Sequence, residues 1–102
     1  MRVMQRGISI ILPGKMAEAM ELSKQLVAIL DRVGFPPFKI YQPYAGGADV
    51  MHTLVFEGEW DSFTTLGTLG DKVLIDPELQ ALAPKLAAVR ESHRVEFYTL
   101  VP

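Results

Sequence analysis

The sequence contains no cysteine, which excludes disulfide bonds, thiolate catalysis and sulfur-ligated zinc or iron–sulfur sites. It has two histidines, His52 and His93, too few for a multi-histidine metal site within one chain. A phosphate-binding loop and a nucleophile elbow are also missing. We therefore expect no metal and no cofactor.

An excess of charge and a long apolar run are missing as well. Ten basic and twelve acidic residues are scattered along the chain, so a basic surface for nucleic acid is not expected. No stretch approaches the ~20 apolar residues that cross a bilayer. Arg6 interrupts the first apolar run and Pro13 ends it, which makes it too short for a signal peptide. We expect a cytoplasmic protein without nucleic-acid or membrane partners.

The 102 residues are 49% hydrophobic, enough for the core of a single domain spanning residues 1–102. Apolar periodicity predicts a strand over 2–12 and a helix over 15–33, ended by Gly34. Strands over 38–44 and 49–58 follow, joined by a glycine turn at 45–48. Ser62 is expected to begin a helix that runs to 74, and Asp76-Pro77 to begin another. A strand over 94–101 closes the chain.

This order predicts an α+β fold, the ferredoxin-like β-α-β-β-α-β arrangement. Right-handed crossovers place the first and third strands in the middle of a four-stranded antiparallel sheet of order 4-1-3-2. Helices cover one face of such a sheet, and an apolar opposite face requires a partner. We therefore predict a homodimer. Strict alternation assigns the following residues to the opposite face: Val3, Ile11, Met51, Val55, Tyr98 and Leu100.

Three segments resemble the dimeric α+β barrel superfamily, and within it NIPSNAP-type proteins. They are Leu12-Pro13-Gly14-Lys15 after the first strand, Trp60 after the third, and Asp76-Pro77-Glu78-Leu79-Gln80 at the last helix. The resemblance implies two subunits forming a dimeric α+β barrel, with a small-molecule pocket between sheet and helices. Relatives include cofactor-independent oxygenases, cyclases and haem-degrading enzymes. The oxygenase and haem-degrading branches usually carry a histidine after the tryptophan; residues 61–76 contain none, which argues against haem ligation of that kind.

One group of residues is a candidate site. Alternation places Arg6 and His52 on apolar strand faces that we expect beneath the helices, with Gln42 and Tyr44 on the neighbouring strand. His52 and Tyr44 are the candidate catalytic residues, with a neutral imidazole acting as general base beside a phenol. Arg6, Gln42 and Trp60 are the candidate ligand-binding residues.

Structural roles compete with each of these assignments. A single histidine on an apolar strand face is often a hydrogen-bonded core residue, and Trp60 is also interpreted as a packing anchor. His93 is expected near a helix C-terminus, where its charged form suits the helix dipole. Three functions stay open: binding of a small, largely apolar or aromatic molecule, a cofactor-independent monooxygenase or cyclase acting on an aromatic or polyketide-like substrate, and a structural dimerisation module.

Overall fold

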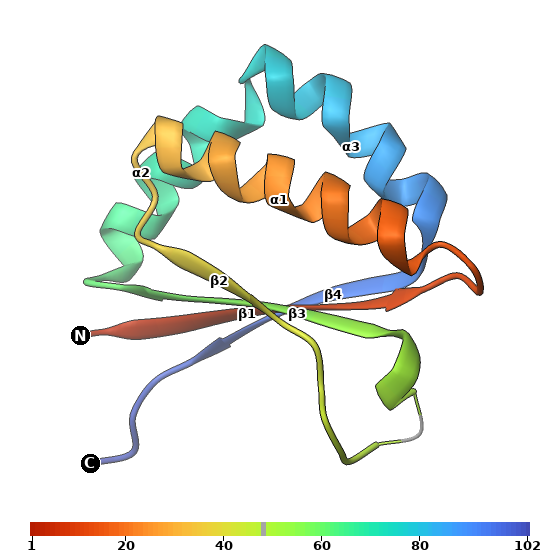
Figure 1. Ribbon diagram of the computed structural model, residues 1–102. Coiled ribbons are helices and arrows are strands. Elements are labelled where there is room, and N and C mark those ends of the chain that lie inside the picture. The colour runs from red at the N-terminus through yellow and green to blue at the C-terminus, as the bar shows by residue number, and fades with distance from the viewer. Residues whose placement is uncertain (48) are drawn as a thin grey trace.

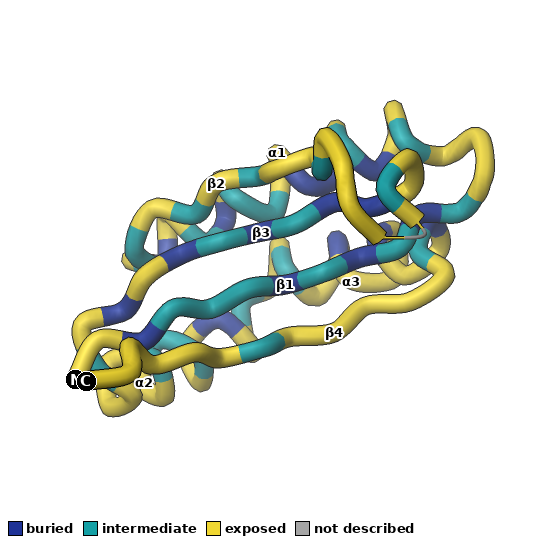
Figure 2. Tube along the Cα trace, turned by 90° about the horizontal axis from the view of Figure 1, so that it is seen from below, coloured by how far each residue is buried: buried dark blue, intermediate teal, exposed yellow. Residues whose placement is uncertain are grey.

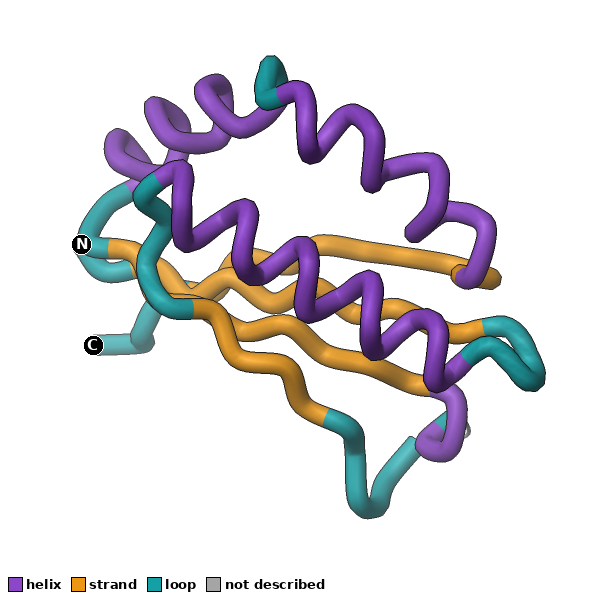
Figure 3. The backbone as a smooth tube through the Cα atoms, turned by 45° about the horizontal axis from the view of Figure 1, so that its top comes forward, coloured by secondary structure: helices purple, strands orange, loops and turns teal. Residues whose placement is uncertain are grey.

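Four strands and three helices form two layers (Figure 1). The computed structural model describes residues 1–47 and 49–102. The strands and the short 3-10 helix are β1 (Val3–Ile11), β2 (Phe38–Tyr41), η1 (Val50–His52), β3 (Thr53–Trp60) and β4 (Arg90–Tyr98). The helices are α1 (Met16–Val33), α2 (Phe63–Leu74) and α3 (Pro77–Val89). The helices α1, α2 and α3 all lie on one side of the sheet (Figures 1 and 3).

The sheet is antiparallel with the order β2-β3-β1-β4. This is the predicted order, and it confirms the ferredoxin-like fold. In the centre, Arg6 of β1 pairs with Glu57 of β3 on one side and with Glu96 of β4 on the other. Paired residues of antiparallel strands point to the same face, so this register determines which side chains share a surface.

The helix ends follow local chemistry that the sequence predicts. Gly34 ends α1 with φ 106°, a left-handed conformation that favours glycine, and its amide donates to the carbonyls of Leu30 and Asp31. Ser62 caps α2 by accepting a hydrogen bond from the Thr65 amide. Asp76 caps α3 in the same way, with Pro77 at the first helical turn.

The core lies between α1, α3 and the helix-facing side of β1 and β3. Its apolar side chains come from all three helices and both central strands, which joins the two layers into one unit. The buried members are Ile11, Ala19, Leu22, Ile29, Val33, Leu54, Val73, Leu82, Leu86 and Val89.

Three strands, β1, β2 and β3, are shorter than predicted, and β4 is displaced. β2 stops at Tyr41 and β3 starts at Thr53, because η1 precedes β3. Ala48 of the predicted glycine turn lies outside the described residues, while Gly46 and Gly47 have the positive φ expected of a tight reversal. β4 begins directly after α3 and ends at Tyr98. Within the described residues, no helix has the length and apolar character to cross a membrane.

Candidate functional site

The two faces of β1 carry different side chains from those predicted. Val3 and Ile11 are 0% and 2% exposed, so the odd-numbered residues of β1 face the helices. We predicted Val3 and Ile11 for the opposite, open face, and Arg6 for the helix side; both predictions are wrong. Val55 and Tyr98 do belong to the open face, because they are in register with Ile8 and Met4, the even-numbered residues of β1.

His52, Gln42 and Tyr44 do not meet Arg6 beneath the helices. His52 belongs to η1 rather than to a strand, and it is exposed. Gln42 and Tyr44 lie after the end of β2 and are exposed as well. The structure therefore does not assemble the predicted general base and phenol into a site between sheet and helices, and catalytic roles for His52 and Tyr44 stay predictions.

Arg6 lies on the open face among charged partners. Its Nη2 donates to Glu57 Oε1 at 3.1 Å, and its guanidinium carbon is 5.4 Å from the centre of the Tyr98 ring. Glu96 accepts hydrogen bonds from both Tyr98 Oη and Arg94 Nε, which lowers the pKa of the Glu96 carboxyl and raises that of Tyr98. Arg6 thus belongs to a polar network on the exposed surface of the sheet rather than to an enclosed pocket.

Trp60 is a packing residue that also fixes a polar group. It is 1% exposed, and its ring meets Phe35 edge-on at 4.8 Å between centroids. Its Nε1 donates to Gln5 Oε1 at 2.9 Å, so the buried indole N–H has the partner it requires. This contact places the Gln5 side chain on the helix-facing side of β1.

The same side of β1 carries a histidine–serine pair that the sequence pattern did not predict. Ser9 is 1% exposed, and its Oγ lies 2.8 Å from Nδ1 of His93 on β4. Ser9 and His93 are direct register partners. Gly7 makes room for the ring, because a Cβ added there would lie 3.3 Å from His93 Cε1. His93 therefore lies in a strand, and the predicted role beside a helix dipole is wrong.

The environment of His93 favours its neutral form. His93 is exposed as a residue, but partial burial of its ring against β1 lowers its pKa below the usual value, and the positive charge of Arg90 lowers it further. Nε2, the second ring nitrogen, has no hydrogen-bond partner among the described residues, in contrast to Nδ1. The site thus offers one ring nitrogen held by the protein and one free to meet another molecule.

Apolar side chains continue the surface beside this pair. Val95 and Phe97 are the register partners of Gly7 and Gln5, so they share the helix-facing side with His93. They remain 45% and 46% exposed, because the helices cover β4 less completely than β1 and β3. Figure 2 shows β4 as a mostly exposed edge strand next to the partly buried β1. This side of β1 and β4 therefore combines a polar pair with accessible apolar groups.

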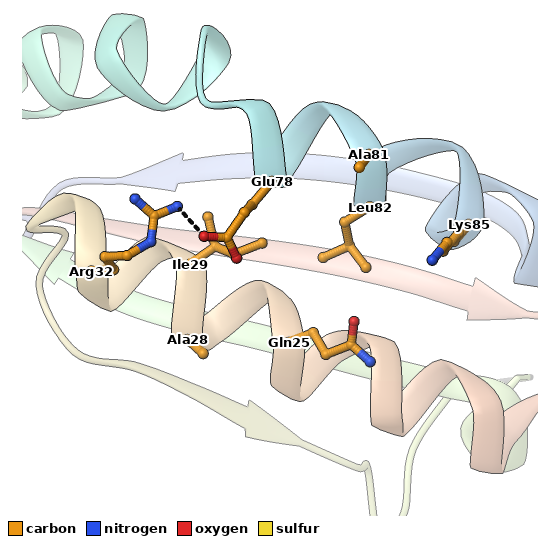
Figure 4. A pocket seen from close by; sticks show the side chains of 8 residues that line it. All are labelled: Gln25, Ala28, Ile29, Arg32, Glu78, Ala81, Leu82 and Lys85. Atoms are coloured by element: carbon orange, nitrogen blue, oxygen red, sulfur yellow. Dashed lines mark ion pairs between the residues drawn. The ribbon is translucent and has the colours of Figure 1, made fainter.

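A groove of about 460 Å³ between α1 and α3 offers less chemistry (Figure 4). At one end, Arg32 contacts both oxygens of Asp76 at 2.8 Å and Glu78 at 3.2 Å. Asp76 also accepts from the Leu79 amide, and these partners lower the pKa of its carboxyl. The charges satisfy one another and tie the end of α1 to the start of α3. Among the described residues, no three His, Asp or Glu side chains form a metal-binding group.

No established family model and no curated protein sequence matches this chain. Solved structures do match it over nearly its whole length. A NIPSNAP family protein from Agrobacterium tumefaciens has a TM-score of 0.82 at 19% identity, covering 99% of this chain and 94% of its own. An uncharacterised NIPSNAP domain protein from Burkholderia xenovorans has a TM-score of 0.79 at 21% identity, covering 100% and 94%. SnoaB, a cofactor-independent oxygenase from Streptomyces nogalater, has a TM-score of 0.70 at 16% identity, covering 97% and 92%. The predicted resemblance to NIPSNAP-type proteins is thereby confirmed at the level of the fold.

Proposed function

We propose that this protein is a homodimer that binds a small, largely apolar molecule on the helix-facing side of β1 and β4. The observation that carries the binding proposal is the exposure of Val95 and Phe97 beside the Ser9–His93 pair. Apolar groups on the helix-facing side of a sheet are normally buried by the protein itself. Covering them with a ligand removes their surface from water, while the free Nε2 of His93 supplies a directional contact.

The dimer is proposed on the composition of the open face. Its central strands carry Met4, Ile8 and Ile10 of β1 and Val55 of β3, the register partner of Ile8, at partial exposure around the Arg6–Glu57 pair. A 102-residue chain gains stability by covering such a face with a second copy of itself. In a twofold arrangement each residue is present twice, so one altered side chain acts on both halves of the interface.

Sedimentation velocity at micromolar concentration tests the dimer. Ile8→Asp places a carboxylate in the middle of the open face, and we expect it to convert the dimer to monomer. Ala17→Asp is the matched control, because it adds the same charge at an exposed position in the first turn of α1. A monomer for the unaltered chain, or a dimer that survives Ile8→Asp unchanged, would refute the assembly.

A thermal-shift screen with phenols, fatty acids and haem tests ligand binding. A ligand present at 100 times its Kd stabilises the native state by about 2.7 kcal/mol, which corresponds to a rise in Tm on the order of 10 °C for a domain of this size. Val95→Ser should abolish the shift, whereas Met51→Ser should preserve it, because Met51 is exposed on η1 away from β4. An unchanged Tm with every compound would favour a purely structural dimerisation module.

A second candidate function is a cofactor-independent monooxygenase or cyclase. The fold likeness to SnoaB and the presence of a neutral imidazole beside an apolar surface support it. Oxygen consumption with aromatic substrates that pass the binding screen tests this activity. Turnover that disappears in His93→Gln, with binding retained, would support an enzyme; turnover independent of His93 would remove this residue from the mechanism.

A further inference from the structure

The hydroxyl of Ser9 determines where the proton of His93 lies. Ser9 is 1% exposed. Among the described residues, the side-chain Oγ of Ser9 has one hydrogen-bond partner, Nδ1 of His93. A serine hydroxyl has one proton to donate, and a buried donor without an acceptor is strongly unfavourable. Nδ1 must therefore accept the Ser9 proton. The opposite arrangement, in which Nδ1–H donates to Oγ, leaves the buried O–H without an acceptor.

A neutral imidazole with an unprotonated Nδ1 carries its proton on Nε2. The partial burial of the ring and the nearby charge of Arg90 both favour the neutral form by lowering the pKa of His93. Gly7 leaves room for the ring to lie close to β1, because a Cβ there would lie 3.3 Å from Cε1 and 3.9 Å from Nε2. Nε2–H has no partner among the described residues. The ring thus presents a neutral N–H donor beside Val95 and Phe97.

We infer that Ser9 holds His93 as the Nε2–H tautomer, so that the site recognises a carbonyl oxygen on an apolar or aromatic ligand. This inference rests on the proposed binding function and makes its ligand class specific. A carbonyl oxygen accepts from Nε2–H and has no proton of its own to place, whereas a ligand hydroxyl that accepts there needs a second partner for its proton. A neutral donor aimed at a carbonyl also stabilises negative charge that develops on that oxygen. Ser9 is a positioning residue in this arrangement, acting through His93.

Long-range proton–nitrogen NMR correlation spectra of the free protein, at about pH 8, test the tautomer directly. We expect an acceptor-type Nδ1 and a proton-bearing Nε2 for His93, while the exposed His52 serves as an internal reference. Ser9→Ala should release the ring to a mixture of both tautomers. Ser23→Ala is the matched control, because Ser23 is an equally buried serine on α1. A protonated Nδ1 in the unaltered protein would overturn the inference without any variant having to fold.

Two probes of similar size test the ligand class. We expect 2-acetylnaphthalene, which has a carbonyl, to bind about tenfold more tightly than 2-ethylnaphthalene, which has none. Ser9→Ala should reduce this preference, and Ser23→Ala should not. Equal affinities would refute carbonyl recognition while leaving the binding function intact. If neither probe binds, even with Nδ1 shown to be the acceptor, both proposals fail together. Preference for 2-naphthoate over the ketone would show that charge, not the neutral donor, governs recognition, and would also overturn the inference.

Discussion

Gly58 on β3 provides a quantitative test of the aromatic packing beneath α1. A Cβ added to Gly58 would lie 2.6 Å from both Cδ1 and Cζ of Phe38, its cross-strand partner on β2. Ordinary carbon–carbon contacts are about 3.5–4.0 Å, so the ring would have to move by roughly 1 Å. Phe38 also meets Trp60, with 6.4 Å between ring centroids, so a displaced ring disturbs the buried indole.

We expect Gly58→Ala to destabilise the native state by about 1–3 kcal/mol, the usual range for an overpacked site. Its backbone conformation is not the cause, because Gly58 has no positive φ. Removing the ring with Phe38→Ala should eliminate the clash. In that background Gly58→Ala should become neutral or stabilising by about 0.5 kcal/mol, since alanine lowers the entropy of the unfolded chain.

The unaltered protein, Gly58→Ala, Phe38→Ala and the double variant form a double-mutant cycle. Chemical denaturation, monitored by the fluorescence of Trp60, measures the free energy of unfolding of each. Every sample must have the same protein concentration, because association adds to the apparent stability. The expected coupling energy is about 1–3 kcal/mol. If Gly58→Ala destabilises the protein equally with and without the Phe38 ring, the ring does not lie on Gly58 and the reasoning is refuted.

Three further predictions concern helix capping and pH. Ser62→Ala should lower the stability by about 1 kcal/mol in denaturant melts, because the Thr65 amide loses its acceptor. Ser62→Asp should retain most of the native stability, because an aspartate can also accept from this amide. Arg32 lowers the pKa of Asp76, so the native state loses stability as the pH falls through and below about 4; Asp76→Asn retains a cap and should flatten this acid limb of the stability curve. The pKa of His93 is lowered as well, so its contribution is complete above about pH 6.5 and is lost as the pH falls below that value. In melts between about pH 5 and 8, His93→Gln should therefore be less sensitive to acid, and an unchanged slope would contradict the assigned environment.

The sequence was sufficient to predict the element order and the helix ends. Gly34, Ser62 and Asp76 act through neighbours in the chain, so their roles follow from local chemistry without knowledge of the fold. The strand order follows from the same reasoning, because few topologies satisfy right-handed connections for this sequence of elements.

The site was not predictable in the same way, because it depends on which face each strand presents. η1 ends at His52, so the alternation that begins at Thr53 does not extend to this histidine. Leu54 and Phe56 lie beyond that interruption, and both are buried on the side that faces the helices. The environment of His93 depends on the β1–β4 register, which places it opposite Ser9 and beside a glycine that can accommodate a ring. Ser9 and His93 are 84 residues apart in the sequence, so no local pattern indicates that they pair.

The distribution of apolar residues along β1 bears on the assembly. Apolar residues occur at both parities of β1: Val3 and Ile11 face the helices, while Ile8 and Ile10 face the open side. A strand with one solvated face alternates apolar and polar residues, whereas a strand covered on both faces is apolar throughout. β1 is not apolar throughout, because Gln5 and Ser9 face the helices and Arg6 faces the open side, but Ile8 and Ile10 give that open side an apolar part that this chain alone does not cover. The open side of β4 carries Ser92, Arg94, Glu96 and Tyr98, a mostly polar set suited to an edge in water. If a second copy covers the sheet, its contact should centre on β1 and β3 and leave β4 at the rim.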